Sequence, residues 1–168
     1  MHNHNHIIRD FNLEDSKQIT RLFNEFGRYL RDLDTTDLNL ILSPANYGDI
    51  SLAGLLQNIK EKDGKILVVE IAEKIVGFIS GVVLHVGFKP DEMDCKPHLM
   101  GRVTTLFISK DFRGLGLGLE LIEKIETFFR EQKCYKVNIE VFGPNNNALN
   151  FYEKHKYRVR NYDLVKLL

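Results

Sequence analysis

The residues best suited to chemistry form a short glycine-rich run. Three glycines alternate with two leucines directly after an arginine, in Arg113-Gly114-Leu115-Gly116-Leu117-Gly118. Glycine permits backbone conformations and close approaches that a Cβ would block, and the periodic apolar segment that follows places the run at the start of a helix. The N–H groups at a helix N-terminus are unpaired, and the helix dipole favours negative charge there. With Arg113 at its mouth, the run is therefore suited to bind a pyrophosphate.

The spacing excludes two common phosphate loops. A Walker loop needs Gly-Lys-Ser/Thr five positions after its first glycine, but Leu119-Glu120 stands at that distance from Gly114. The dinucleotide fingerprint Gly-x-Gly-x-x-Gly would put its third glycine at Leu119 or Leu121, depending on which glycine comes first. What remains is Arg-x-x-Gly-x-Gly, beginning at Arg113. Alone, this pattern also fits a helix start that merely needs flexible residues.

A second motif follows one predicted strand later. It reads Asn145-Asn146-Asn147-Ala148-Leu149-Asn150-Phe151-Tyr152-Glu153-Lys154, and the strand before it is Val137–Val141. Both motifs, in this order, resemble the GNAT superfamily of acetyltransferases, which carries Arg-x-x-Gly-x-Gly and then Asn-x-x-Ala-x-x-hydrophobic-Tyr-Glu-Lys. The resemblance is detailed from Arg102 to Tyr157. One departure is Lys156-Tyr157, where Gly-Phe is common in the family.

The resemblance implies a fold and a cofactor. The fold is α/β: a single domain over residues 1–168, with a central, mostly antiparallel twisted sheet flanked by helices and a splayed parallel strand pair that forms the cofactor cleft. The implied cofactor is acetyl-CoA, with CoA as product. The expected cofactor-binding residues are Leu106, Phe107, Ile108, Arg113, Gly114, Leu115, Gly116, Leu117, Gly118, Asn145 and Tyr152.

The resemblance also implies transfer of an acetyl group to a primary amine of a small molecule or peptide, by direct attack in a ternary complex. Tyr152 matches a tyrosine that lies near the cofactor sulfur, so its expected role is general acid to the departing thiolate. The alternative is a tyrosine that only packs against the pantetheine arm.

The general base is less determined by the sequence. An alkylamine has a pKa of about 10 and is largely protonated at neutral pH, so some group must take its proton. Several family members use a glutamate on the strand before the loop, where this chain has Thr104 and Thr105. Glu140 and His85 are the candidates on neighbouring strands, and Glu140 is the expected catalytic residue of the two. A structural role is an alternative for both.

These motifs need a scaffold, and the hydrophobic pattern predicts one mixed α/β domain. Apolar residues recur at helical spacing from Glu14 onward and again after Gly118. β-branched runs on both sides of Glu73-Lys74 predict an antiparallel hairpin. The full predicted order is a strand at 6–9, helices from 14 and at 50–60, strands at 66–71 and 75–86, an exposed excursion at 87–97, a strand at 102–109, a helix after 118, a strand at 136–142, a helix at 145–155 and a closing strand at 157–167.

Composition argues against several classes of protein. Lys plus Arg and Asp plus Glu each count 23 in 168 residues, so the net charge is zero, without the basic excess of a nucleic-acid or anionic-membrane binder. No apolar run reaches the length of a bilayer span and no signal-peptide layout is present, so a cytoplasmic protein is expected. Cys95 and Cys134 are expected to be small, partly buried thiols. The histidines within residues 1–6 are expected to lie in a hydrated terminus, and no metal site is predicted.

Two groups of acidic residues bear on the identity of the acceptor. Acidic residues in the segments expected to form the acceptor site would favour a cationic amine by raising its local concentration, but a solvated loop face explains them equally well. Many members of the family dimerise, so the resemblance leaves a homodimer open. The acidic residues are Asp32, Asp34, Asp37 and Asp49 on one side and Asp91, Glu92 and Asp94 on the other.

Two functions other than catalysis stay open. The chain could be an acyl-CoA sensor that binds the cofactor without turnover, because it lacks the family's glutamate; Tyr152 argues against this. Alternatively, it could be a partner-binding domain in which the glycine run is incidental, which predicts no CoA binding.

Overall fold

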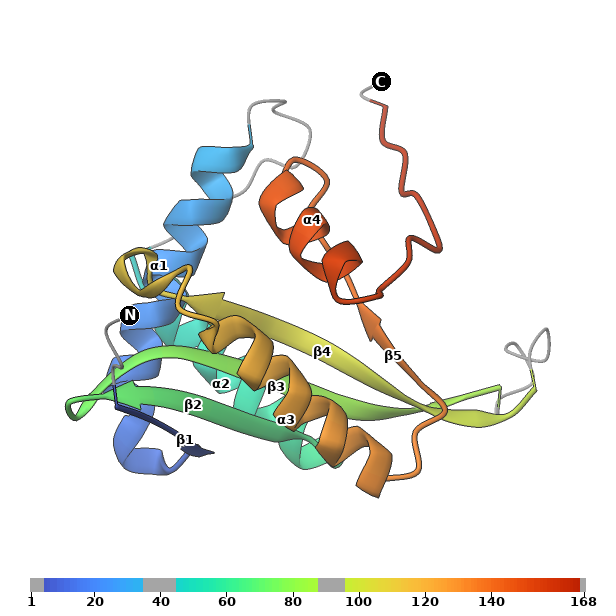
Figure 1. The fold of residues 1–168 in the computed structure, drawn as a ribbon, viewed down its shortest axis with the longest axis horizontal. Coiled ribbons are helices and arrows are strands. Elements are labelled where there is room, and N and C mark those ends of the chain that lie inside the picture. The colour runs from blue at the N-terminus through green and yellow to red at the C-terminus, as the bar shows by residue number, and fades with distance from the viewer. Residues whose placement is uncertain (1–4, 35–44, 88–95, 167–168) are drawn as a thin grey trace.

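The computed structural model describes residues 5–34, 45–87 and 96–166, which contain one five-stranded sheet of order β1-β2-β3-β4-β5 (Figure 1). The first four strands pair antiparallel in sequence order, and β5 pairs parallel to β4. The strands are β1 (His6–Asp10), β2 (Lys65–Ile71), β3 (Lys74–Val86), β4 (His98–Ile108) and β5 (Lys136–Ile139). The helices are α1 (Ser16–Leu33), α2 (Tyr47–Glu61), α3 (Leu117–Glu131) and α4 (Asn146–Lys154), with 3-10 turns at Leu13–Asp15 and Lys110–Phe112.

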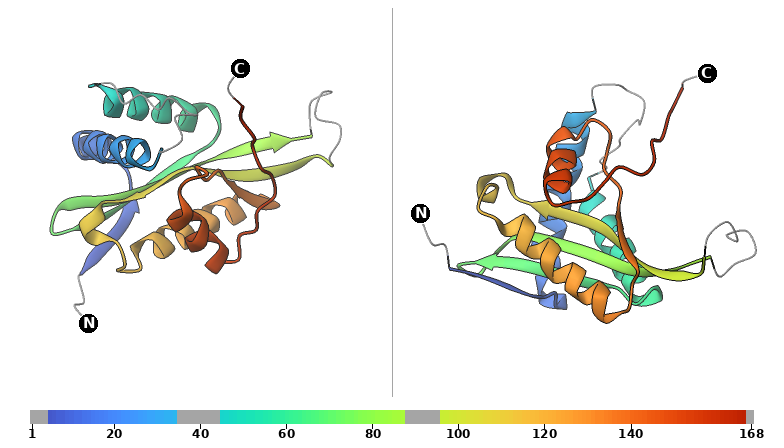
Figure 2. Two further views of the ribbon diagram at one scale, coloured as in Figure 1. Left: turned by 90° about the horizontal axis from the view of Figure 1, so that it is seen from above. Right: turned by 45° about the vertical axis from the view of Figure 1, so that its right-hand side comes forward.

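Helices cover both faces of the sheet (Figure 2). On one face, α1 and α2 pack on β2 and β3 around a core that includes Leu22, Phe23 and Phe78. On the other face, α3 packs on the same strands and on β4, and α4 lies beside its start. Burying a large apolar side chain contributes about 1.5–3 kcal/mol, so the amphipathic faces hold both layers on the sheet. The predicted mixed α/β architecture is confirmed.

Two glycines bring α3 close to the sheet. A Cβ on Gly101 would lie 2.4 Å from the ring of Phe129, and one on Gly81 would lie 2.5 Å from it. Only a residue without a side chain therefore allows the last turns of α3 to seat on β3 and β4. This contact fixes the helix axis, and with it the position of the glycine run at the other end of α3.

The parallel pair separates partway along β4. Register pairs join β4 and β5 from Met100 with Lys136 to Val103 with Ile139, and then pairing stops. β4 continues to Ile108 with β3 as its only partner in the described sheet. The splayed parallel pair expected from the sequence is therefore present.

Several predicted boundaries change, and one element is absent. β4 begins at His98, before the predicted start, and β5 ends at Ile139, before the predicted end. The closing strand predicted at 157–167 is wrong for its described part, because 157–166 has no regular structure and is mostly exposed. Lys156 has a left-handed φ of 70°, and the Tyr157 hydroxyl donates to Glu126 of α3 at 2.7 Å. The chain is thereby held beside α3 as it leaves α4.

Some predictions fall outside the described residues: His2, His4, Asp37, Asp91, Glu92, Asp94, Cys95 and most of the excursion at 87–97. His6, which was expected in a hydrated terminus, lies instead in β1, with its Nε2 2.8 Å from Glu120. Cys134 is partly buried, as predicted, and burial raises the pKa of its thiol. None of the described helices is both long enough and apolar enough to cross a bilayer.

Candidate active site

The glycine run forms an open loop in front of α3. Gly114 and Gly116 have left-handed φ values of 81° and 85°, and α3 begins directly afterwards at Leu117. A Cβ on either glycine would meet nothing within 4 Å, so the space above the loop is free. None of the backbone N–H groups from Gly114 to Gly118 donates to a described residue. The left-handed turns and the unpaired N–H donors together suit this loop to binding a phosphate group.

Beyond Val103 and Ile139, β4 and β5 no longer pair, and we call the space between them the splay. The edge of β4 that faces the splay is open except at the Ile108 carbonyl, which accepts from Arg113. The N–H of Ser109 donates to the Val76 carbonyl of β3 at 2.8 Å. Hydrogen-bonding direction alternates along an antiparallel strand, so the backbone groups of Leu106 and Ile108 point away from β3, toward the side that β5 has left. An extended ligand lying in the splay could pair with these groups as a further strand would.

Arg113 lies along this edge. Its Nε donates to the Ile108 carbonyl at 2.9 Å. Its guanidinium lies 4.6 Å from the ring centre of Tyr29 and 5.5 Å from that of Phe107. The positive charge is therefore placed between the loop and the open strand edge, packed against two aromatic rings.

The opposite wall of the splay is the start of α4. Asn145 is buried, and its Oδ1 accepts from the Ala148 N–H at 3.2 Å, which caps the helix. The same oxygen accepts from the Tyr29 hydroxyl at 3.0 Å. Tyr29 on α1 thus contacts both sides of the splay: Asn145 at the start of α4, and Arg113 beside the edge of β4. Tyr29 could not be singled out from the sequence, where its only signal is its place three positions after Phe26 in the helical pattern.

Tyr152 lies in the core formed by α4 and the start of α3. It is 9% exposed, and its ring lies 5.2 Å from Phe151 and 5.6 Å from Tyr157. Its hydroxyl makes no hydrogen bond to a described residue, and burial raises the pKa of the phenol to about 12. Tyr152 therefore keeps its proton throughout the neutral range. α4 also touches the loop, since a Cβ on Gly118 would lie 3.6 Å from Phe151.

The two candidate bases occupy different places. Glu140 follows the end of β5 and lines a cavity of about 210 Å³ together with Thr104. Its carboxylate is 79% exposed and lies 3.2 Å from Nη2 of Arg102. His85 on β3 pairs with Leu99 of β4, just before the segment of β4 that pairs with β5. It therefore lies at the other end of that segment from the splay. Thr104 itself lies 2.8 Å, oxygen to oxygen, from the Ser80 hydroxyl.

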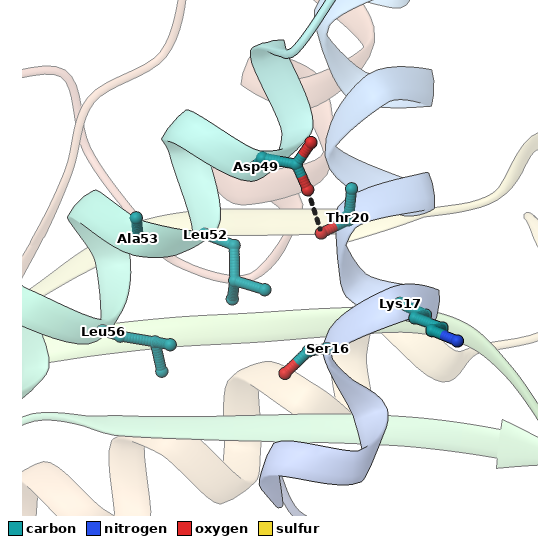
Figure 3. A pocket seen from close by; sticks show the side chains of 7 residues that line it. All are labelled: Ser16, Lys17, Thr20, Asp49, Leu52, Ala53 and Leu56. Carbon is teal, nitrogen blue, oxygen red and sulfur yellow. Dashed lines mark hydrogen bonds between the residues drawn. The ribbon is translucent and has the colours of Figure 1, made fainter.

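A larger cavity lies elsewhere, between α1 and α2 (Figure 3). Its volume is about 380 Å³, and it is lined by both polar and apolar residues: Ser16, Lys17, Thr20, Asp49, Leu52, Ala53 and Leu56. Asp49, one of the acidic residues noted in the sequence, accepts from the Thr20 hydroxyl here at 3.3 Å. None of the predicted cofactor or catalytic residues borders this cavity. Within the described ranges, no cluster of three or more His, Cys, Asp or Glu side chains could hold a metal ion.

Comparison with known proteins adds an independent finding. Residues 23–157 match the family model of the acetyltransferase (GNAT) family. An acetyltransferase of Sodalis glossinidius (strain morsitans) is 31% identical over 102 residues, and the match spans 61% of this chain and 61% of that relative.

Solved structures share the fold. A tetramutant of a Bacillus halodurans protein has a TM-score of 0.80 at 19% identity, covering 96% of this chain and 99% of that one. Glucosamine-6-phosphate N-acetyltransferase from Arabidopsis thaliana has a TM-score of 0.66 at 18% identity, covering 97% of this chain and 98% of that one. At these identities the likeness concerns the fold alone.

Proposed function

The chain belongs to the GNAT family of acetyltransferases, and from this premise we propose that it transfers the acetyl group of acetyl-CoA to a primary amine. The amine nitrogen attacks the thioester carbonyl in a ternary complex. A C–N bond forms, the C–S bond breaks, and one amine proton is transferred overall to the sulfur. The products are an N-acetylated amine and CoA.

The observation that carries this proposal is the unpaired backbone at two adjoining places. The N–H groups of Gly114 to Gly118 are suited to the pyrophosphate, and the backbone groups of Leu106 with the N–H of Ile108 are suited to the amide-bearing pantetheine arm. The Ile108 carbonyl already accepts from Arg113. Asn145, on the facing wall, can contact the arm from the other side. An N–H of the free edge can also stabilise the negative charge that develops on the thioester oxygen. Arg113 lies between the loop and the β4 edge, so its guanidinium can contact the pyrophosphate or the pantetheine arm.

Tyr152 is the proposed proton or hydrogen-bond donor to the departing sulfur. Its pKa of about 12 keeps the phenol protonated, with its hydroxyl unpaired among the described residues. An alkyl thiol has a pKa of about 8.5, so complete proton transfer from the phenol would be uphill by several kcal/mol. Hydrogen-bond donation to the developing thiolate is therefore its main contribution, as the C–S bond breaks.

Glu140 is the proposed acceptor of the amine proton, directly or through water. It follows the last β4–β5 pair and borders the cavity at the point where the strands separate. This cavity is the route by which an amine could reach an acyl group lying in the splay. The exposed carboxylate can exchange its proton with solvent after each turnover.

One observation favours a second candidate function, an acyl-CoA sensor of weak catalytic power. Thr104 lies on β4 near the position of the family's glutamate and contacts Ser80, so β4 offers no carboxylate there. A sensor would bind acetyl-CoA without releasing thiol.

Thiol release in the presence of acetyl-CoA and a panel of primary amines separates the two functions. Enzyme activity predicts amine-dependent CoA release that falls sharply in Tyr152→Phe, whereas binding without release for every amine would favour the sensor. Gly116→Glu serves as the binding control, because a carboxylate in the loop should repel the pyrophosphate. Absence of acetyl-CoA binding by the unaltered protein would refute both functions.

A further inference from the structure

The cavity beside Glu140 lies at the point where β4 and β5 separate, on the side of the sheet that carries α2. Thr104 and Glu140, which both line it, are the first residues beyond the last register pair, Val103 with Ile139. The glycine run lies past the opposite end of the free β4 edge, after Ile108. An acyl-CoA bound as proposed above would therefore have its pyrophosphate at the loop and its acyl end toward this cavity. The acceptor inference rests on that proposed function.

The charged groups lining the cavity are two cations and one carboxylate. Arg102 comes from β4, Lys62 from the end of α2, and Glu140 from beyond β5. The pair between Arg102 and Glu140 is 3.2 Å long, with the side chains 39% and 79% exposed, so solvent weakens it. The Nε of Arg102 is buried without a hydrogen-bond acceptor. Lys62 forms no ion pair with any residue that the structure describes.

Three backbone carbonyls near the end of α2 already accept hydrogen bonds within the protein. The Asn58 carbonyl accepts from the Lys62 N–H at 3.1 Å, and the Ile59 carbonyl accepts from the Gly64 N–H at 3.0 Å. The Lys62 carbonyl accepts from the Val83 N–H, also at 3.0 Å. These carbonyls are therefore already paired within the protein, and the excess charge of the lining is the ammonium of Lys62.

We infer that the acceptor is a small primary amine that also carries a carboxylate or a phosphate group. The anionic group of the acceptor binds to Lys62 and to Arg102. There it replaces Glu140 as the partner of the Arg102 guanidinium. Its amine then lies beside Glu140, facing the acyl group. The cavity volume of about 210 Å³ lies below the roughly 300–1,000 Å³ typical of drug-sized ligands, so a compact acceptor fits better than a long one.

Binding of matched amines to the CoA-loaded protein tests this inference without depending on turnover. The pairs are phosphoethanolamine with ethanolamine and β-alanine with β-alaninamide, and spermidine represents a purely cationic amine. Isothermal titration should show that one anionic member binds a few-fold more tightly than its neutral partner, as expected for charge contacts made by exposed or half-exposed side chains. The preferred pair distinguishes a phosphate from a carboxylate.

Variants of two neighbouring lysines locate the effect. Lys62→Gln should remove most of the preference for the anionic member while leaving binding of the neutral partner unchanged. Lys60→Gln, an exposed position on the same helix that does not line the cavity, should keep the preference. Both lysines are exposed, so thermal unfolding should be nearly unchanged and a loss of preference would not reflect misfolding.

The outcomes separate the two proposals. If CoA binds but the neutral amines or spermidine bind as tightly as the anionic ones, or no amine binds, the acceptor inference is overturned and the proposed function stands. An equal loss of preference in Lys60→Gln and Lys62→Gln also overturns it. If CoA does not bind, the proposed function fails and the acceptor inference fails with it.

Discussion

Replacement of Gly116 by alanine separates the conformational role of the loop from its proposed role in binding. Gly116 has a φ of 85°, where a residue with a Cβ is disfavoured by about 1–2 kcal/mol. The new Cβ would meet nothing within 4 Å, so no clash adds to this cost. For a domain of this size, the expected fall in Tm is about 2–8 °C. The variant should therefore remain folded.

The effect on cofactor affinity should be larger than the effect on stability. If the backbone near residue 116 relaxes toward negative φ, the N–H groups of Gly116 and Leu117 no longer converge on the pyrophosphate. Each hydrogen bond to a charged group contributes about 1.5–3 kcal/mol, so loss of one raises the Kd for CoA by about tenfold or more. Isothermal titration with CoA, beside thermal unfolding of the same samples, measures both quantities.

Gly54→Ala is the matched control for Gly116→Ala. Gly54 is exposed within α2, a Cβ there also meets nothing within 4 Å, and its φ is not positive. Alanine should stabilise this helix by about 0.5–1 kcal/mol and leave the Kd for CoA unchanged. A Gly116→Ala protein with lowered Tm and unchanged affinity would refute the assignment of the loop to the pyrophosphate.

Four further outcomes follow from the contacts. Tyr152→Phe should lower kcat by about 10- to 100-fold, as expected for loss of a hydrogen bond to a developing charge, with nearly unchanged affinity for acetyl-CoA; an unchanged kcat would leave Tyr152 only a packing role. Tyr29→Phe keeps the ring over Arg113 but removes the bond to Asn145, so titration should show CoA binding weakened a few-fold, and unchanged affinity would make the bond incidental. Asp15→Asn should cost about 1–3 kcal/mol in urea unfolding at pH 7, because the Asp15 carboxylate accepts from both Nη atoms of Arg9, at 2.7 and 2.9 Å. Arg9 lowers the pKa of Asp15, so the stability that this pair contributes is present above about pH 3.8 and is lost as pH falls through the folded-state pKa. If Asp15→Asn lost as much unfolding free energy on acidification as the unaltered protein, this explanation would be contradicted. The pKa of Tyr152 rises from 10.0 to about 12 on folding, so the contribution of this phenol to folding stability is complete below pH 10 and is lost as pH rises through 12. Melting curves should therefore show a smaller fall in Tm at alkaline pH for Tyr152→Phe than for the unaltered protein.

Elements with strong local signals could be predicted from the sequence. The apolar period of α3 and the alternation of glycines before it placed the loop and helix correctly, because both signals arise from neighbouring residues. The β2–β3 hairpin was also predicted, and its turn has positive φ at Ala72 and Glu73. The predicted roles of Tyr152 and Glu140 remain proposals, although Glu140 lies at the splay and Tyr152 packs on Phe151, which lies near Gly118 of the loop.

Features that depend on distant parts of the chain were not predictable in the same way. Strand limits depend on pairing partners as well as propensity, so β5 ends where β4 diverges, and the closing segment stays unpaired in spite of its β-branched residues. Tyr29 meets Asn145 across 116 positions of sequence. The cavity that joins Lys62 to Arg102 needs α2 and β4 together, so neither residue stood out from its sequence neighbours.

Backbone amide shifts during titration of ¹⁵N-labelled protein with acetyl-CoA test the central claim most directly. The account predicts that the largest changes occur at Leu106, Ile108 and the glycine run from Gly114 to Gly118. Residues around the cavity between α1 and α2, such as Leu52 and Leu56, should change little. Shifts concentrated at that cavity, or no saturable shifts, would contradict the proposal that this chain binds acetyl-CoA in the splay between β4 and β5.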